Sequence, residues 1–147
     1  MSTISIAVQA TPEQVWRALT DAGTTPAYYY GFRGEFDLHA GAPYRYTAGG
    51  ADMITGSVLS VDAPKSLVTT FNGHWDPAVA ALPESTVTIT LGDPPMATPG
   101  VTVVTLVHDG LPDGEAADSL AAGWVMILSG MKTLLETGAP LVPGTGA

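Results

Sequence analysis

The sequence predicts one α+β domain in which a curved antiparallel sheet of about seven strands wraps around a long C-terminal helix. Two observations lead to this fold class. Short apolar and polar alternations, separated by glycine and proline, recur between residues 35 and 108, a pattern typical of an antiparallel sheet. Helical periodicity then runs from Glu115 to about Thr137, which is long enough for a helix that spans a whole domain.

The chain begins with one strand and two short helices. The strand is predicted at residues 3–9, because apolar and polar side chains alternate there. Thr11 stands where a helix N-cap is needed, a proline follows it, and Gln14 is spaced to close a capping box. A second short helix is predicted within residues 25–30, a stretch that ends in three consecutive tyrosines and is stopped by a glycine.

Six further strands are predicted between this segment and the last helix. Their expected bounds are 35–39, 44–48, 53–62, 67–73, 85–91 and 102–108. Turn residues separate consecutive strands, which favours an antiparallel meander. The stretch 74–83 is long for a hairpin connection and unusually apolar for an exposed loop, so we expect it to cover part of the molecule.

The C-terminal helix is predicted to bury one side and to leave an apolar patch on the other. At 100° per residue, its apolar positions fall within an arc of roughly 140°. These positions are Leu120, Gly123, Trp124, Ile127, Leu128, Met131, Leu134 and Leu135. Val125 and Met126 lie on the back of the helix in a stretch without charge, which predicts a second contact there, for example in a homodimer. Residues 1–138 are then expected to form the domain and 139–147 a flexible tail.

Composition narrows the class of partner. Hydrophobic residues make up 46% of the chain and charged residues 13%, which predicts a folded domain with a large interior. Five Lys and Arg against fourteen Asp and Glu give a net charge of −9, so no nucleic acid partner is expected. The absence of a signal-peptide pattern and of a spanning apolar stretch predicts a cytoplasmic protein without membrane insertion. The chain has no cysteine and three widely spaced histidines, so neither a metal site nor a cofactor is expected.

Several segments resemble a known superfamily, in the same order along nearly the whole chain. They are residues 10–21, 29–31, 56–59, 63–67, 84–88, 106–110 and 123–138, of which the closing Gly-Trp to Leu-Glu-Thr-Gly segment is the most specific. The sequence resembles the SRPBCC (START/Bet v 1-like) superfamily, and in it the branch named after the activator of heat-shock protein 90 ATPase. This resemblance implies the START-like helix-grip fold, with a space between the helix and the sheet. Members of the superfamily include lipid and hormone carriers, polyketide aromatases and cyclases, oxygenase domains and cochaperone domains.

The candidate ligand-binding residues are mostly aromatic. They are Tyr28, Tyr30, Tyr44, Tyr46, His74, Trp75, His108, Trp124, Leu128 and Met131. Tyrosine combines a large apolar face with one hydroxyl, which suits a cavity that orients a mostly apolar molecule. Tyr44 and Tyr46 share one face of a strand, so both point inward or both cover the surface. Simple core packing is the competing interpretation for the helix residues, and a cross-strand aromatic pair is the competing interpretation for these two tyrosines.

Three functions are compatible with this sequence. The leading hypothesis is a domain that binds a small apolar or aromatic molecule in an internal cavity between the C-terminal helix and the sheet. A polyketide cyclase-like or aromatase-like enzyme is the first alternative, with His74, Asp76, His108 or a tyrosine as proton donor or acceptor. It requires at least two titratable groups that converge inside the cavity. The second alternative is a cochaperone-like or dimeric interaction module that uses the back of the helix.

Overall fold

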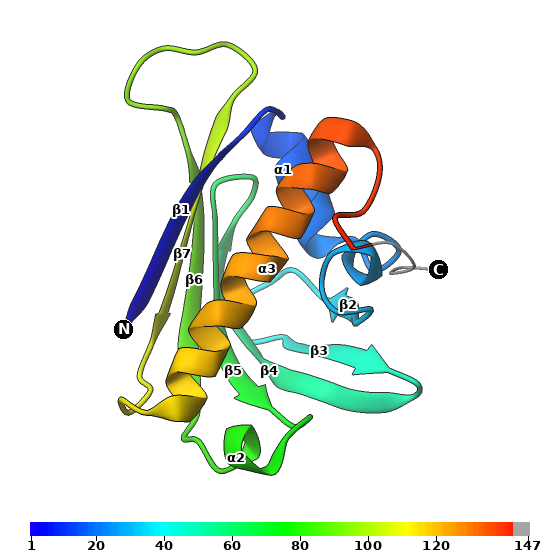
Figure 1. The fold of residues 1–147 in the computed structure, drawn as a ribbon, viewed down its shortest axis with the longest axis vertical. Helices are drawn as coiled ribbons and strands as arrows, with labels where there is room; N and C mark the ends of the chain where they lie inside the picture. Colours follow the sequence, from blue (N-terminus) through cyan, green and yellow to red (C-terminus); the bar gives the residue numbers. More distant parts are fainter. Residues whose placement is uncertain (143–147) are drawn as a thin grey trace.

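The computed structural model describes residues 1–142, which form a seven-stranded antiparallel sheet with one long helix across its face (Figure 1). The strand order is β1-β7-β6-β5-β4-β3-β2. The elements are β1 (Ser2–Val8), α1 (Pro12–Thr20), the 3-10 helix η1 (Thr25–Ala27), β2 (Arg33–Phe36), β3 (Pro43–Ala48), β4 (Ala51–Asp62), β5 (Ser66–Gly73), α2 (Pro77–Ala80), β6 (Ser85–Gly92), β7 (Thr102–Asp109) and α3 (Glu115–Thr137). Residues 143–147, in the predicted tail, lie outside the described residues.

Helix α1 begins, and helix α3 ends, where the local sequence signals predict. The Gln14 amide donates to Thr11 Oγ1 at 3.2 Å and the Thr11 amide donates to Gln14 Oε1 at 2.9 Å, so the predicted capping box is present. Gly138 ends α3 in the left-handed conformation, with its amide bonded to the Leu134 carbonyl. Among the described residues, none of the helices is both long and apolar enough to cross a membrane.

The structure corrects the prediction in two short segments. The second helix is only the 3-10 turn η1, and the chain reverses at Tyr30, whose φ is 52°. The stretch 74–83, expected to be a connection that covers part of the molecule, contains α2, and the Ala78 amide at its start donates to Asp76 Oδ1 at 2.7 Å. Because a single turn has no periodicity of its own, the apolar pattern alone gave no sign of it.

Strand β2 spans Arg33–Phe36 and not the predicted residues 35–39, and it includes Gly34, which lies close to neighbouring side chains. The Gly34 amide donates to Thr25 Oγ1 at 2.7 Å, and a Cβ there would lie 2.8 Å from the ring of Tyr46. A glycine gives no hydrophobic signal, so alternation did not reveal this buried start of the strand. The close approach holds η1 against the end of the sheet that β2 and β3 form.

The core lies between α3 and the sheet and includes the C-terminal half of the helix. Val15, Leu106 and Met131 are fully buried there. Lys132 Nζ donates to the Ala7 carbonyl at 2.9 Å, which ties this half of α3 to β1. The N-terminal half of α3 crosses the other part of the sheet, and the tip of the β3–β4 hairpin lies apart from it (Figure 1).

Candidate ligand-binding site

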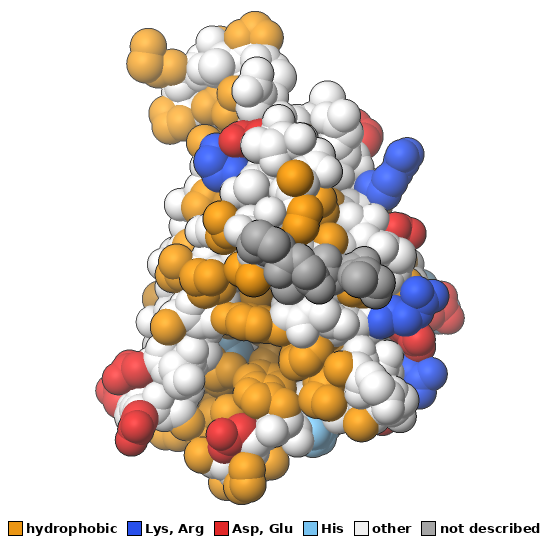
Figure 2. Space-filling view, turned by 45° about the vertical axis from the view of Figure 1, so that its right-hand side comes forward, with side chains coloured by type: hydrophobic (Ala, Val, Ile, Leu, Met, Phe, Trp, Pro, Cys, Tyr) orange, Lys and Arg blue, Asp and Glu red, His pale blue; other side chains and the backbone are white. Residues whose placement is uncertain are grey.

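An open cleft of about 520 Å³ lies beside the N-terminal half of α3. Its walls come from the segment after η1, the start of β4, the end of β5 with the loop that follows, and α3. The lining residues are Tyr29, Tyr30, Phe32, Ala51, Asp52, Met53, Ile54, Phe71, His74, Trp75, Ser119, Leu120, Gly123, Trp124 and Ile127. Figure 2 shows hydrophobic side chains gathered in a hollow in the lower half of this face. The lining is mostly apolar and aromatic, as in small-molecule sites.

A much smaller inner chamber, with a volume of about 30 Å³, lies next to the cleft and is lined mostly by residues of the sheet. Its lining residues are Leu19, Tyr28, Tyr29, Phe36, Tyr44, Tyr46, Leu67, Thr69, Phe71, Val87, Ile89, Leu106, Trp124, Ile127 and Leu128. Four side chains, those of Tyr29, Phe71, Trp124 and Ile127, line both spaces. The space between helix and sheet therefore contains an open cleft and a small inner chamber that share four wall residues.

The tyrosines of β3 both face the interior. Tyr44 and Tyr46 are each about nine-tenths buried and line the inner chamber. The ring of Tyr44 stacks on Phe36 with a centroid distance of 5.2 Å, and Tyr46 stacks on Tyr29 at 4.3 Å. The sequence left open whether they form an aromatic pair or a pocket wall, and they contribute to both.

Trp124 is held in place by a buried hydrogen-bond chain. Its Nε1 donates to His108 Nδ1 at 2.9 Å, so the neutral imidazole carries its proton on Nε2, which bonds Ser85 Oγ at 2.7 Å. Burial lowers the pKa of His108 to about 4; the N-terminal ammonium adds to this and Asp109 opposes it. Both ring nitrogens are occupied by protein groups, so His108 orients the indole from behind the cleft.

Three predicted residues lie at the lip of the cleft. His74 Nε2 and Thr55 Oγ1 are hydrogen-bonded at 2.7 Å, and Trp75 packs edge-on against Phe71 while 41% of its surface stays exposed. Tyr30 is exposed and lies near Gly123 of α3.

The remaining predicted residues divide between the inner chamber and the packed core. Tyr28 and Leu128 line the inner chamber. His108 and Met131 line neither the cleft nor the inner chamber. Met131 is fully buried and belongs to the packed half of α3.

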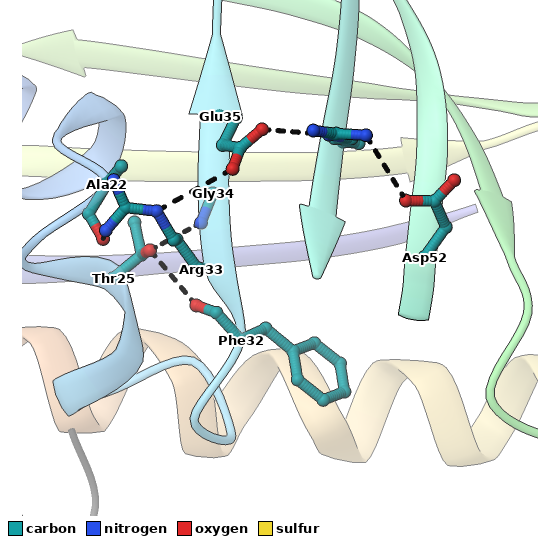
Figure 3. Close-up of polar contacts among 8 residues, drawn as sticks. Ala22, Thr25, Phe32, Arg33, Gly34, Glu35 and Asp52 are labelled. Atoms are coloured by element: carbon teal, nitrogen blue, oxygen red, sulfur yellow. Dashed lines mark hydrogen bonds and ion pairs between the residues drawn. The ribbon is translucent and has the colours of Figure 1, made fainter. Parts of the chain in front are cut away.

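The charged groups near the cleft pair with one another on the outer face of the sheet. Arg45 lies between the inward-facing Tyr44 and Tyr46 and therefore points outward. Its Nε bonds Glu35 at 2.8 Å, and a second nitrogen lies 3.9 Å from Asp52 (Figure 3). The hydrogen bond from Arg45 lowers the pKa of Glu35 below its ordinary value. Within residues 1–142, no three His, Asp or Glu side chains are grouped so that they could hold a metal ion.

The model of the family described as Activator of Hsp90 ATPase homolog 1-like protein matches residues 9–136. The chain belongs to this family. The resemblance to the SRPBCC superfamily and to its Hsp90-activator branch is thereby confirmed, and so is the helix-grip fold. The chain matches none of the curated proteins significantly.

Solved structures show the same fold as this Hsp90-activator-like domain. Protein MLL2253 from Mesorhizobium loti is 26% identical, with a TM-score of 0.72, and the match covers 91% of this chain and 96% of that one. DynU16, a protein of the dynemicin biosynthetic locus, is 23% identical with a TM-score of 0.71, covering 95% of this chain and 48% of the other. The Aha1 dimer from Colwellia psychrerythraea is 16% identical with a TM-score of 0.72, covering 93% and 96%.

Sequence reasoning missed several residues that line the cleft of this family member. Phe32, Ile54, Phe71 and Ile127 all take part in its walls. Tyr29 stood between two tyrosines that were predicted as ligand-binding residues, and only the backbone reversal at Tyr30 decides which rings point inward. Phe71 and Ile54 had the alternation of buried strand residues, a signal that marks a core and a pocket wall alike.

Proposed function

We propose that this domain binds one small, mostly apolar or aromatic molecule in the cleft, with one end of the molecule in the inner chamber. The cleft itself carries the proposal, because its 520 Å³ is within the range of roughly 300–1,000 Å³ for small-molecule sites. Six aromatic side chains contribute to its walls, and none of its lining residues is a lysine or arginine. DynU16, which shares the fold, comes from a biosynthetic locus, and this supports a role in binding a small organic molecule.

Binding is favoured over the cyclase-like alternative by the positions of the titratable groups. An enzyme of that kind needs two such groups directed at the bound molecule. His108 uses both ring nitrogens within the protein, and Asp76 caps α2. His74 is bonded to Thr55 at the lip, and Asp52 is directed at Arg45. The arrangement supplies a shaped aromatic surface more readily than a proton donor and acceptor.

Gly123 offers a way to test the cleft without disturbing the core. A Cβ at this position meets only the Tyr30 hydroxyl, at an ordinary contact distance of 3.7 Å. Leucine in place of glycine inside a helix also raises helix stability by up to about 1 kcal/mol. Gly123→Leu should therefore fill part of the cleft and weaken binding, while the melting temperature of the free protein stays the same or rises.

The probes for this test are 2-acetylnaphthalene and 2-isopropenylnaphthalene, titrated by quenching of tryptophan fluorescence and by thermal shift. For the natural chain, we expect saturable binding of one probe molecule per protein molecule, together with a raised melting temperature. Ala122→Leu places the same side chain on the exposed side of the same helix and should leave binding unchanged. The proposal is wrong if neither probe binds, or if both leucine variants bind as the natural chain does.

We propose in addition that two copies associate through the back of α3. Val125 and Met126 are 51% and 44% exposed there. The fold neighbour from Colwellia psychrerythraea is a dimer, which supports asking the same of this chain. Adjacent exposed apolar side chains on one helix face are typical of a contact surface.

A further inference from the structure

The four tyrosines of the inner chamber differ in what their hydroxyls do. The Tyr28 hydroxyl donates to the Ala18 carbonyl at 2.7 Å, and the Tyr44 hydroxyl donates to the Thr70 carbonyl at 2.5 Å. The hydroxyls of Tyr29 and Tyr46 have no hydrogen-bond partner among residues 1–142. Two of the four phenols are therefore fixed by main chain, and two are available.

The two hydroxyls without a partner keep some exposed surface although their side chains are nearly buried. Tyr29 and Tyr46 are only 6% and 7% exposed. No fully buried side-chain nitrogen or oxygen lacks a hydrogen-bond partner in the described part of the chain, so these two hydroxyls are not fully buried. The inner chamber is the space that both side chains line. Burial raises the pKa of both phenols well above the ordinary value, and they stay neutral O–H donors at any physiological pH.

The size of the inner chamber limits what these hydroxyls can meet. A space of about 30 Å³ exceeds the 10–15 Å³ or so that one water needs, but it is too small for an aromatic ring. Its other walls are largely hydrocarbon, for example Phe36, Leu67 and Leu106. An oxygen placed there without a hydrogen bond would be disfavoured, and an oxygen bonded to either phenol would be stabilised.

We propose that the Tyr29 and Tyr46 hydroxyls hydrogen-bond an oxygen at the inner end of the ligand, so that the domain selects apolar or aromatic molecules with a carbonyl or hydroxyl group at one end. This inference rests on the proposed ligand-binding function and adds the chemical class of the ligand to it. The hydroxyls of the stacked Tyr29 and Tyr46 rings would fix the orientation of the ligand. Its oxygen would enter the chamber, and its apolar body would lie against Phe71 and Trp124 in the cleft.

The test is a thermodynamic cycle that combines the change of one ligand atom with the removal of one protein hydroxyl. The probes are 2-acetylnaphthalene and 2-isopropenylnaphthalene, which have nearly the same shape. The carbon attached to the ring is double-bonded to oxygen in the first and to CH₂ in the second. The protein changes are Tyr29→Phe and Tyr46→Phe, which remove the hydroxyl and keep the stacked ring. Each should lower the affinity ratio of ketone to hydrocarbon by about fivefold, the factor for one neutral hydrogen bond, while the affinity for the hydrocarbon stays the same.

Tyr28→Phe is the matched control, because its hydroxyl is used by Ala18 and its ring lines the same chamber. It should lower the melting temperature and leave the affinity ratio unchanged. Tyr29→Phe and Tyr46→Phe break no hydrogen bond within the protein and should melt close to the natural chain.

Three outcomes separate the inference from the function beneath it. A ratio that falls in Tyr29→Phe or Tyr46→Phe, and not in Tyr28→Phe, supports the inference. If both probes bind and all variants keep the same ratio, the inference is wrong and the ligand-binding function stands. If neither probe binds to the natural chain, the function is wrong and the inference fails with it.

Discussion

The two halves of α3 carry the same apolar stripe but face different surroundings. In the C-terminal half, Leu128 and Met131 are 1% and 0% exposed, and helix α1 and strand β1 lie against this part of α3. In the N-terminal half, Leu120, Gly123 and Trp124 line an open cleft. One amphipathic helix therefore forms packed core at one end and the wall of an open cleft at the other, and the apolar stripe itself does not distinguish the two ends.

The two halves of α3 differ because hydrogen bonds tie the C-terminal half to the neighbouring part of the chain. At the C-terminal end of α3, the Gln9 amide donates to Glu136 at 2.8 Å and Lys132 bonds the Ala7 carbonyl, so helix and strand are tied together. At the other end, α2 and the β3–β4 hairpin lie apart from the helix (Figure 1). Aromatic side chains from both sides narrow this gap without filling it.

Trp124 lines both the cleft and the inner chamber, and its removal should have the largest effect. Trp124→Ala is expected to destabilise the fold by about 3–5 kcal/mol, because it deletes a large buried ring and leaves His108 Nδ1 without its donor. Urea unfolding followed by circular dichroism measures this change.

Trp75→Ala is the matched control at the lip of the cleft. Its ring is 41% exposed, so the cost should be less than half of that for Trp124→Ala. Equal costs would mean that the lip is as much a part of the core as the helix, and the contrast between the two regions would fail.

The pH dependence of stability tests the packing behind Trp124. The pKa of His108 is about 4 in the folded protein and near 6.5 in the unfolded chain, so the unfolded chain binds more protons between these values. The contribution of His108 to stability is therefore fully present above about pH 6.5. It is lost as the pH falls toward 4, by at most about 3 kcal/mol.

Comparison with His108→Gln isolates this contribution from those of other groups. Glu35 and Glu136 have lowered pKa values, so they also favour folding less in acid. The difference in unfolding free energy between the two proteins should shrink as the pH falls from 6.5 to 4. A difference that does not change with pH would show that His108 is not buried as a neutral base.

The fold was predicted where the signal is local, but the sequence did not reveal how the residues of the candidate site meet, because these residues are distant in sequence. The capping box at Thr11 and the helix end at Gly138 depend on residues within a few positions of each other. The ring of His108 instead meets Ser85 from β6 and Trp124 from α3. The direction of Tyr29 depends on the reversal at Tyr30, which no pattern of hydrophobicity encodes.

Overpacking distinguishes the two halves of α3 directly. Met131→Trp inserts volume into a filled core and should cost about 1–3 kcal/mol. Gly123→Trp places the same indole in the cleft and should cost less than that, because the space is open. Chemical unfolding of both variants provides the comparison, and a larger cost at Gly123 would mean that the cleft is closed in solution.

The smallest expected change in stability is on the third surface of α3, its exposed back. Met126→Glu replaces a side chain that is 44% exposed, so the unfolding free energy of the monomer should change by no more than about 0.5 kcal/mol. A carboxylate is costly inside a protein contact and harmless in water, so the same change should shift a dimer toward monomer. Size-exclusion chromatography with light scattering measures this shift, with Leu59→Glu on β4 as the control, because Leu59 is 49% exposed on a different element. A natural chain that is monomeric at every concentration, or a dimer that Met126→Glu leaves intact, would limit the function of α3 to its inner side.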